Sequence, residues 1–150
     1  MKPVTVSIEV AAPADRVWAV VTDIGSAQSS IPAIRKIEFL GEKRHGLGTR
    51  WRETRVMFGR EATEDLEITE WRPPGEYVVT ARSHGCDYRS VVRVLPAPAG
   101  ARLEFEFGAT TRTLVAGILA ALTLPFMGRA IRKALSDDLA ALKRRCEAGS

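Results

Sequence analysis

The chain has 150 residues, which fits one domain, and its 45% hydrophobic and 27% charged residues are enough to form a folded core. We expect one soluble globular domain over residues 1–150, in the cytoplasm, because Glu9 interrupts the only early apolar stretch and a secretory signal needs an unbroken one. The formal net charge of +4 is too small an excess to select a class of partner.

The first predicted elements are a strand and a short helix. Residues 4–10 alternate apolar and polar side chains, which is typical of a half-buried strand. Pro13 suits a first helical turn, and Val17, Trp18 and Val21 fall on one face, so a short helix ending near Asp23 is expected next. The following ten residues are rich in turn and cap residues and predict either a loop or one more helical turn.

Six consecutive strands are predicted after residue 33. Each is separated from the next by a turn sequence of the kind that hairpins use. In the last of them, Leu103, Phe105 and Phe107 alternate with charged residues, which indicates a sheet with one apolar face and one solvated face. The predicted strands are residues 34–40, 48–58, 60–71, 76–82, 86–95 and 101–107. A single sheet of this kind needs another element to cover its apolar face.

The cover is predicted to be a helix over residues 111–146. Its large apolar residues fall in two sectors, which change phase at Pro125. We therefore expect the helix to be bent or interrupted within a turn of Pro125, so that both parts face the sheet and the first lines the floor of a cavity. The uncharged stretch at 113–128 is shorter than the ~20 residues of a membrane-spanning helix, so a core or pocket helix is favoured. The first sector holds Leu114, Val115, Ile118, Leu119, Leu122 and Phe126, and the second holds Ile131, Leu135, Leu139, Leu142 and Cys146.

This order of elements resembles the helix-grip fold of the START and birch-pollen-allergen superfamily. Within it, the chain is similar to the bacterial polyketide cyclase/dehydrase and lipid-transport family, often called SRPBCC. The stretches that carry the resemblance are VSIEVAAPADRVWAVVTD at 6–23, GLGTRW at 46–51, ITEWRPPGEYVV at 68–79 and LSDDLAALKRRCE at 135–147. The resemblance implies an α+β fold in which a seven-stranded antiparallel sheet wraps a long C-terminal helix, with two short helices after the first strand. It also implies an apolar cavity between sheet and helix.

Strand alternation and the helical sectors give the candidate ligand-binding residues. An apolar concave surface with few polar groups is the usual form of a small-molecule site. The candidates are Trp51, Glu53, Arg55, Met57, Glu64, Leu66, Tyr77, Val79, Tyr88, Ser90, Phe105, Ile118, Leu122 and Phe126. Among these, Glu53, Arg55 and Glu64 either orient a polar head group or reach solvent as an ordinary charge pair, and the second interpretation is favoured. The two tyrosines are interpreted as core residues whose hydroxyls reach the rim.

The predicted function is the binding of a hydrophobic small molecule such as a lipid or polyketide, with transport or sequestration as extensions and no assigned catalysis. The family also contains enzymes, so one alternative is a polyketide cyclase or dehydratase that uses Glu53 or Glu64 as a base. A second alternative is an accessory protein that docks on a membrane surface or a protein partner, because the last helix carries several cations.

Several partners and cofactors are not expected. No cofactor or metal is predicted, because Cys86 and Cys146 form no zinc-binding pattern and no phosphate-binding loop is found. Acidic residues are interleaved with the basic ones, which argues against a nucleic-acid partner. No transmembrane segment is expected, peripheral membrane contact stays open, and the expected assembly is a monomer or a homodimer.

Overall fold

The structure, a computed structural model, describes residues 3–57, 59–83 and 85–148, and within these ranges it does not describe the side chains at 57, 83, 116 and 119–127. The elements, in chain order, are β1 (Val4–Val10), α1 (Ala14–Thr22), the 3-10 turn η1 (Ile24–Ser26), α2 (Ala27–Ser30), β2 (Ile34–Phe39), β3 (Arg50–Met57), β4 (Arg60–Arg72), β5 (Glu76–Ser83), β6 (Cys86–Ala97), β7 (Gly100–Thr111) and α3 (Leu114–Ala148). The segment between α1 and β2 is therefore helical, which decides between the two predictions made for it.

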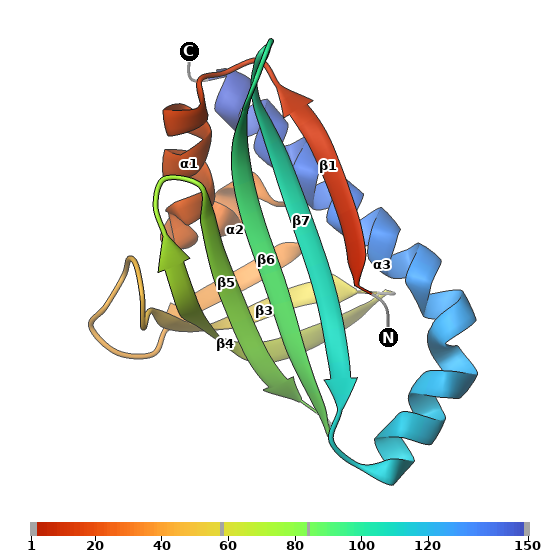
Figure 1. The fold of residues 1–150 in the computed structure, drawn as a ribbon. Helices are drawn as coiled ribbons and strands as arrows, with labels where there is room; N and C mark the ends of the chain where they lie inside the picture. The colour runs from red at the N-terminus through yellow and green to blue at the C-terminus, as the bar shows by residue number, and fades with distance from the viewer. Residues whose placement is uncertain (1–2, 58, 84, 149–150) are drawn as a thin grey trace.

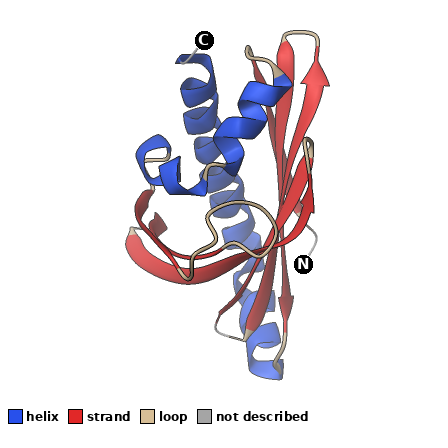
Figure 2. Ribbon diagram, turned by 90° about the vertical axis from the view of Figure 1, so that its left-hand side faces the viewer, coloured by secondary structure: helices blue, strands red, loops and turns tan. Residues whose placement is uncertain are grey.

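All seven strands form one antiparallel sheet in the order β1-β7-β6-β5-β4-β3-β2. From β2 to β7, each strand pairs with the next one in the chain. The first strand, β1, lies at the other edge and pairs with β7, so that Val6 lies opposite Phe105 and Ile8 opposite Leu103. The sheet is strongly curved: in Figure 1 the strands β2, β3 and β4 cross the long strands at a steep angle, and Figure 2 shows α3 on the concave side. The predicted α+β helix-grip architecture is confirmed.

The hydrophobic core fills one end of this concave side. Ile68 from β4, Leu103 from β7 and Leu139 from α3 are almost completely buried there, together with Val17 of α1. Each such side chain stabilises the fold by about 1.5–3 kcal/mol when it leaves water. The C-terminal part of α3 is also tied to β1, because the Lys143 ammonium donates a hydrogen bond to the Glu9 carbonyl at 3.0 Å.

Helix α3 runs without a break from Leu114 to Ala148, so of the two alternatives predicted near Pro125, a bend or an interruption, the interruption is excluded. A proline removes one backbone hydrogen bond, and a long helix tolerates this loss by bending. Figure 1 shows such a change of direction, with the N-terminal part of α3 turned away from the long strands. The side chains on either side of Pro125 lie outside the described residues.

The expected docking of that N-terminal part on the sheet is wrong where it can be checked. Leu114, Val115 and Ile118 are 81%, 68% and 54% exposed. Because this part of the helix leaves the sheet, its large side chains lose the surface on which they were expected to pack. The second apolar sector behaves as predicted, since Ile131, Leu139, Leu142 and Cys146 are buried.

A testable consequence concerns the β6–β7 turn. Gly100 has φ +139°, and a Cβ added there would lie 2.4 Å from the Ala12 carbonyl oxygen. Replacing Gly100 with alanine should cost about 3 kcal/mol or more of unfolding free energy, because backbone strain adds to a clash with rigid backbone.

Gly41 provides the matched control. It has φ +121°, but an added Cβ meets nothing within 4 Å, so Gly41→Ala should cost only the strain, about 1 kcal/mol. Urea denaturation of both variants measures the difference. Equal costs would show that the contact with Ala12 is unimportant.

Candidate functional site

The inner face of the sheet divides into two halves. Beyond the buried core, the inward side chains of β4 to β7 are only half-buried, and we call this set the open half. It consists of Glu64, Leu66, Val79, Ala81, Tyr88, Ser90, Phe105, Phe107 and Ala109. The register lines up Leu66, Ala81, Tyr88 and Ala109 as neighbours across four strands, and the rings of Tyr88 and Phe107 stack with centroids 5.8 Å apart. The open half is therefore a largely apolar surface that solvent reaches.

The N-terminal part of α3 follows β7, the last strand of this surface, directly in the chain and is itself apolar. Residues 113–128 carry no charged side chain, and the exposed Leu114, Val115 and Ile118 belong to this stretch. The candidates Leu122 and Phe126 lie in the same stretch, but their side chains, like that of Met57, are outside the described residues. The open half and the N-terminal part of α3 are thus both largely apolar, which is the composition that a hydrophobic ligand requires.

A polar network closes one side of the concave face. Arg55 of β3 donates from Nε to Glu53 Oε2 at 3.1 Å and from Nη1 to Asp138 Oδ2 of α3 at 3.0 Å, and Trp51 Nε1 donates to Glu53 Oε1 at 3.3 Å. The side chains of Arg55, Glu53 and Asp138 are only 18%, 15% and 8% exposed. The favoured interpretation of Glu53 and Arg55 as a solvated pair is therefore wrong, because their partner is a carboxylate on the covering helix.

The protonation of this network follows from its burial. Burial raises the pKa of the Asp138 carboxyl, although the Arg55 guanidinium opposes that rise. Burial also acts to lower the pKa of Arg55, but the carboxylates of Asp138 and Glu53 outweigh it and leave that pKa above its ordinary value. Arg55 thus stays charged and holds two carboxylates. A groove of about 280 Å³ between Val56 and Ala134 reaches this cluster from outside.

Glu64 is placed differently from Glu53. The two are cross-strand partners on the inner face, yet Glu64 makes no hydrogen bond or ion pair with any residue that the structure describes. Burial raises the pKa of the nearby Tyr88 hydroxyl to about 12, and the charges of Cys86 and Glu64 add to the effect. Glu64 of β4 and Tyr88 of β6 are therefore both polar groups of the open half, on strands that β5 separates.

Tyr77 belongs to the closed end instead. Its hydroxyl donates to the Val21 carbonyl at 2.6 Å, and burial, followed by the charge of Glu53, raises its pKa. Its ring lies 5.9 Å from both Trp18 and Trp71. Trp71 was missed by strand alternation, because a register shift between Ile68 and Glu70 reverses the side of the sheet that the next residues face.

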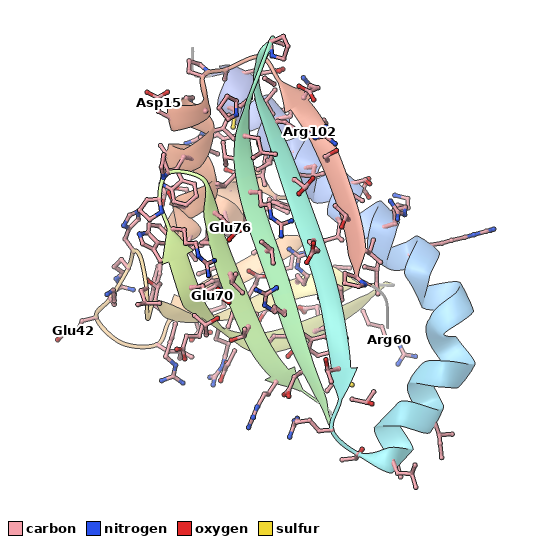
Figure 3. The ribbon with its side chains drawn as sticks, viewed as in Figure 1. Asp15, Glu42, Arg60, Glu70, Glu76 and Arg102 are labelled. Atoms are coloured by element: carbon pink, nitrogen blue, oxygen red, sulfur yellow. The ribbon has the colours of Figure 1, made fainter. Side chains whose placement is uncertain are left out.

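The outer face of the sheet is charged. Figure 3 shows Glu70, Glu76 and Arg102 on the side of the sheet away from α3. A hollow of about 830 Å³ is also lined mostly by residues that alternate outward, including Arg50, Asp65, Glu67, Arg82, Asp87 and Arg89. Its charged walls do not suit a hydrophobic ligand.

Two further kinds of site are absent from the described part of the chain. No group of three or more His, Cys, Asp or Glu side chains is arranged there to hold a metal ion. No helix of that part is long and apolar enough to cross a membrane.

Comparison with known proteins connects this architecture to one family. The family model described as polyketide cyclase / dehydrase and lipid transport matches residues 1–147. No curated protein matches the chain significantly.

Solved structures show the same fold at low sequence identity. The protein TTHA0849 from Thermus thermophilus superposes with a TM-score of 0.79 at 18% identity, covering 99% of both chains. A START superfamily protein from Mycobacterium smegmatis gives 0.77 at 17% identity, again over 99% of both chains. The Zhui aromatase/cyclase from Streptomyces sp. R1128 gives 0.75 at 21% identity, over 97% of this chain and 93% of its own. Such identities support the shared fold alone.

The polar network generates a stability prediction. Replacing Arg55 with leucine leaves two buried carboxylates without their cation, which should lower the unfolding free energy by about 3–5 kcal/mol. Asp138 then has a folded-state pKa further above its ordinary value of 3.8, so the folded state binds more protons than the unfolded state. The variant should therefore lose stability as the pH rises from about 4 towards neutrality.

Arg52 on the same strand is the control, because it forms an exposed pair with Asp65 at 2.8 Å on the outer face. Arg52→Leu should cost no more than about 1 kcal/mol and add no comparable pH dependence. Urea denaturation between pH 4.5 and 7.5 compares the variants. Similar losses for both would mean that the Arg55 network is not energetically distinct from a surface pair.

Proposed function

We propose that this chain, which belongs to the polyketide cyclase/dehydrase and lipid transport family, binds a hydrophobic small molecule between the open half of its sheet and the N-terminal part of α3. The ligand class is that of a lipid or a polyketide, and transport or sequestration is the consequence of binding without reaction. A cytoplasmic location is part of the same proposal.

One observation carries the proposal. The inward aromatic and aliphatic side chains are buried at the end where α3 packs on the sheet, and they are half-buried at the end where α3 diverges from it. Apolar side chains on two facing elements that do not cover one another are stabilised when a third apolar body fills the space. The exposed Leu114, Val115 and Ile118 supply such surface on the helix.

The candidate residues have different parts in this proposal. Leu66, Val79, Tyr88, Ser90 and Phe105 line the open half and would contact the ligand. Trp51 is buried and, with Glu53 and Arg55, belongs to the network that holds β3 against α3. Tyr77 supports the closed end through its hydrogen bond to Val21. The contribution of Met57, Ile118, Leu122 and Phe126 stays a prediction.

An enzyme of the cyclase or dehydratase kind is the second candidate. The observation that favours it is Glu64, an inward carboxylate for which no ion pair is found among the described residues, on the same open half as the Tyr88 phenol. Glu53 is a weaker candidate for a base, because its two oxygens accept hydrogen bonds from Trp51 and Arg55. The two functions differ in their product, since only an enzyme would convert a bound poly-β-ketone thioester to a cyclised, dehydrated compound.

Peripheral membrane contact stays an alternative with less support. Of the cations on the last helix, Arg132 donates to the Thr5 carbonyl, Lys133 pairs with Asp137, and Lys143 pairs with Glu147. The two ion pairs reduce the charge that is available to an anionic surface, whereas the hydrogen bond of Arg132 to a neutral carbonyl leaves its charge in place.

The binding proposal is tested by filling the space. Ala81 lies on the inner face between Leu66 and Tyr88, whereas its neighbour Thr80 faces outward. Ala81→Trp should weaken binding of the uncharged fluorescent probe N-phenyl-1-naphthylamine at least about tenfold, because the indole occupies ligand volume. Fluorescence titration gives the dissociation constants.

Thr80→Trp is the matched control and should change the affinity by no more than about twofold. Circular dichroism shows whether both variants fold. Absence of probe binding by the unmodified protein, or equal binding by a folded Ala81→Trp variant, would contradict a ligand site in the open half.

A further inference from the structure

Arg60 carries a guanidinium on the inner face of the sheet, directly after the β3–β4 hairpin. The register between these strands has no shift and pairs Met57 with Arg60 as it pairs Glu53 with Glu64, so Arg60 shares the inner face with Glu64. Its side chain is exposed, and in the view of Figure 3 it lies between the end of the hairpin and the N-terminal part of α3. Arg60 is thus at the margin of the open half, where water reaches it.

The guanidinium of Arg60 is available to a ligand. It forms no hydrogen bond or ion pair with any residue that the structure describes. An arginine has five N–H donors, and a carboxylate can accept two of them side by side in a charge-assisted pair. A ligand carboxylate would therefore meet donors that no described side chain occupies.

The inward carboxylates are not partners of Arg60. Glu53 and Asp138 both accept hydrogen bonds from Arg55, at 3.1 and 3.0 Å, and that network is mostly buried. Glu64 is four residues farther along β4, which is roughly 13 Å at the rise of a strand, and it is not paired with Arg60. Of the two inward arginines, Arg55 thus holds the fold together, whereas Arg60 is left for a ligand.

The facing part of α3 supplies no competing anion. Residues 113–128 have no charged side chain, and the first acidic residue of the helix, Asp137, pairs with Lys133 at 2.8 Å. The side chains that this part exposes, Leu114, Val115 and Ile118, are apolar. Arg60 is therefore a cation at the border between apolar surface and water.

This border position suits the head group of an amphiphile. An unpaired carboxylate is very unfavourable inside an apolar space, whereas beside an exposed guanidinium it gains a partner and keeps part of its hydration. An apolar tail gains instead from contact with inward side chains such as Leu66 and Phe107. Glu64, farther in on the same strand, would repel a carboxylate that moved inward. The charges thus favour one orientation, with the head at the hairpin and the tail on the open half.

We propose that Arg60 receives the carboxylate of an anionic amphiphile, such as a long-chain fatty acid, whose apolar tail lies on the open half. The inference rests on the proposed function, because it assigns the polar end and the orientation of the ligand that the open half would hold.

The experiment compares two competitors that differ only at the polar end. Palmitoleic acid and palmitoleyl alcohol each displace N-phenyl-1-naphthylamine at pH 7.5, below their aggregation concentrations. Arg60→Gln should weaken binding of the acid at least about fivefold and change that of the alcohol by no more than about twofold, because only the acid loses a charged partner. Arg60→Lys keeps the positive charge and should weaken the acid by no more than about twofold.

Arg144→Gln is the matched control. Arg144 is also exposed and forms no hydrogen bond or ion pair with a described residue, but it lies near the C-terminal end of α3. Its loss removes the same charge at a distance from the open half, so both affinities should stay within about twofold of those of the unmodified protein. The comparison separates a contact at Arg60 from the net charge of the protein. Circular dichroism shows whether the variants fold.

The outcomes separate this inference from the proposed function. Three results would overturn the role of Arg60 while leaving the ligand site in place: equal weakening of the acid by Arg60→Gln and Arg144→Gln, equal weakening of acid and alcohol by Arg60→Gln, or an Arg60→Lys variant as weak as Arg60→Gln. A protein that does not bind the probe would overturn both proposals.

Discussion

A single-layer sheet exposes one apolar face that has to be kept from water, and here one helix provides most of the cover. Helix α3 begins at the end of β7 and returns along the concave side, so its C-terminal part meets β1, β7 and α1. The core forms where this cover is complete. Where α3 turns away, the same sheet face stays half-buried. The path of this helix therefore produces both the buried core and the half-buried apolar surface on which the proposed ligand would bind.

The contact of Arg55 with Asp138 fixes the short strands against that helix. The two residues are 83 positions apart in the chain, and their 3.0 Å hydrogen bond joins β3 to α3. A buried ion pair adds little net stability over an apolar contact, but losing one partner is costly, so it specifies how the two elements meet.

The fold by itself does not choose between a carrier and an enzyme. The family includes both descriptions in its name, and the structural relatives at 17–21% identity share the architecture of the chain. The choice depends on a few polar side chains, and Glu64, Tyr88 and Ser90 are those of the open half.

Local periodicity was enough to predict the strands and the helical region of the last segment. The alternation of Leu103, Phe105 and Phe107, and the helical stripe of Leu139, Leu142 and Cys146, result from the geometry of the backbone and need no knowledge of the neighbours. The inward direction of Glu64 also followed from strand parity, because the β3–β4 register has no shift.

The partners of these residues were decided only by tertiary structure. A carboxylate at Asp138, beside the apolar stripe of the helix, indicates a buried polar contact. Its partner Arg55, however, comes from a strand that is distant in the chain. Trp71 faces Trp18 because a register shift alters strand parity, and no local pattern shows that shift. The exposure of Leu114 and Ile118 depends on where α3 leaves the sheet. Periodicity thus determined which elements form, whereas contacts, burial and pKa values depend on elements that the chain brings together only when it folds.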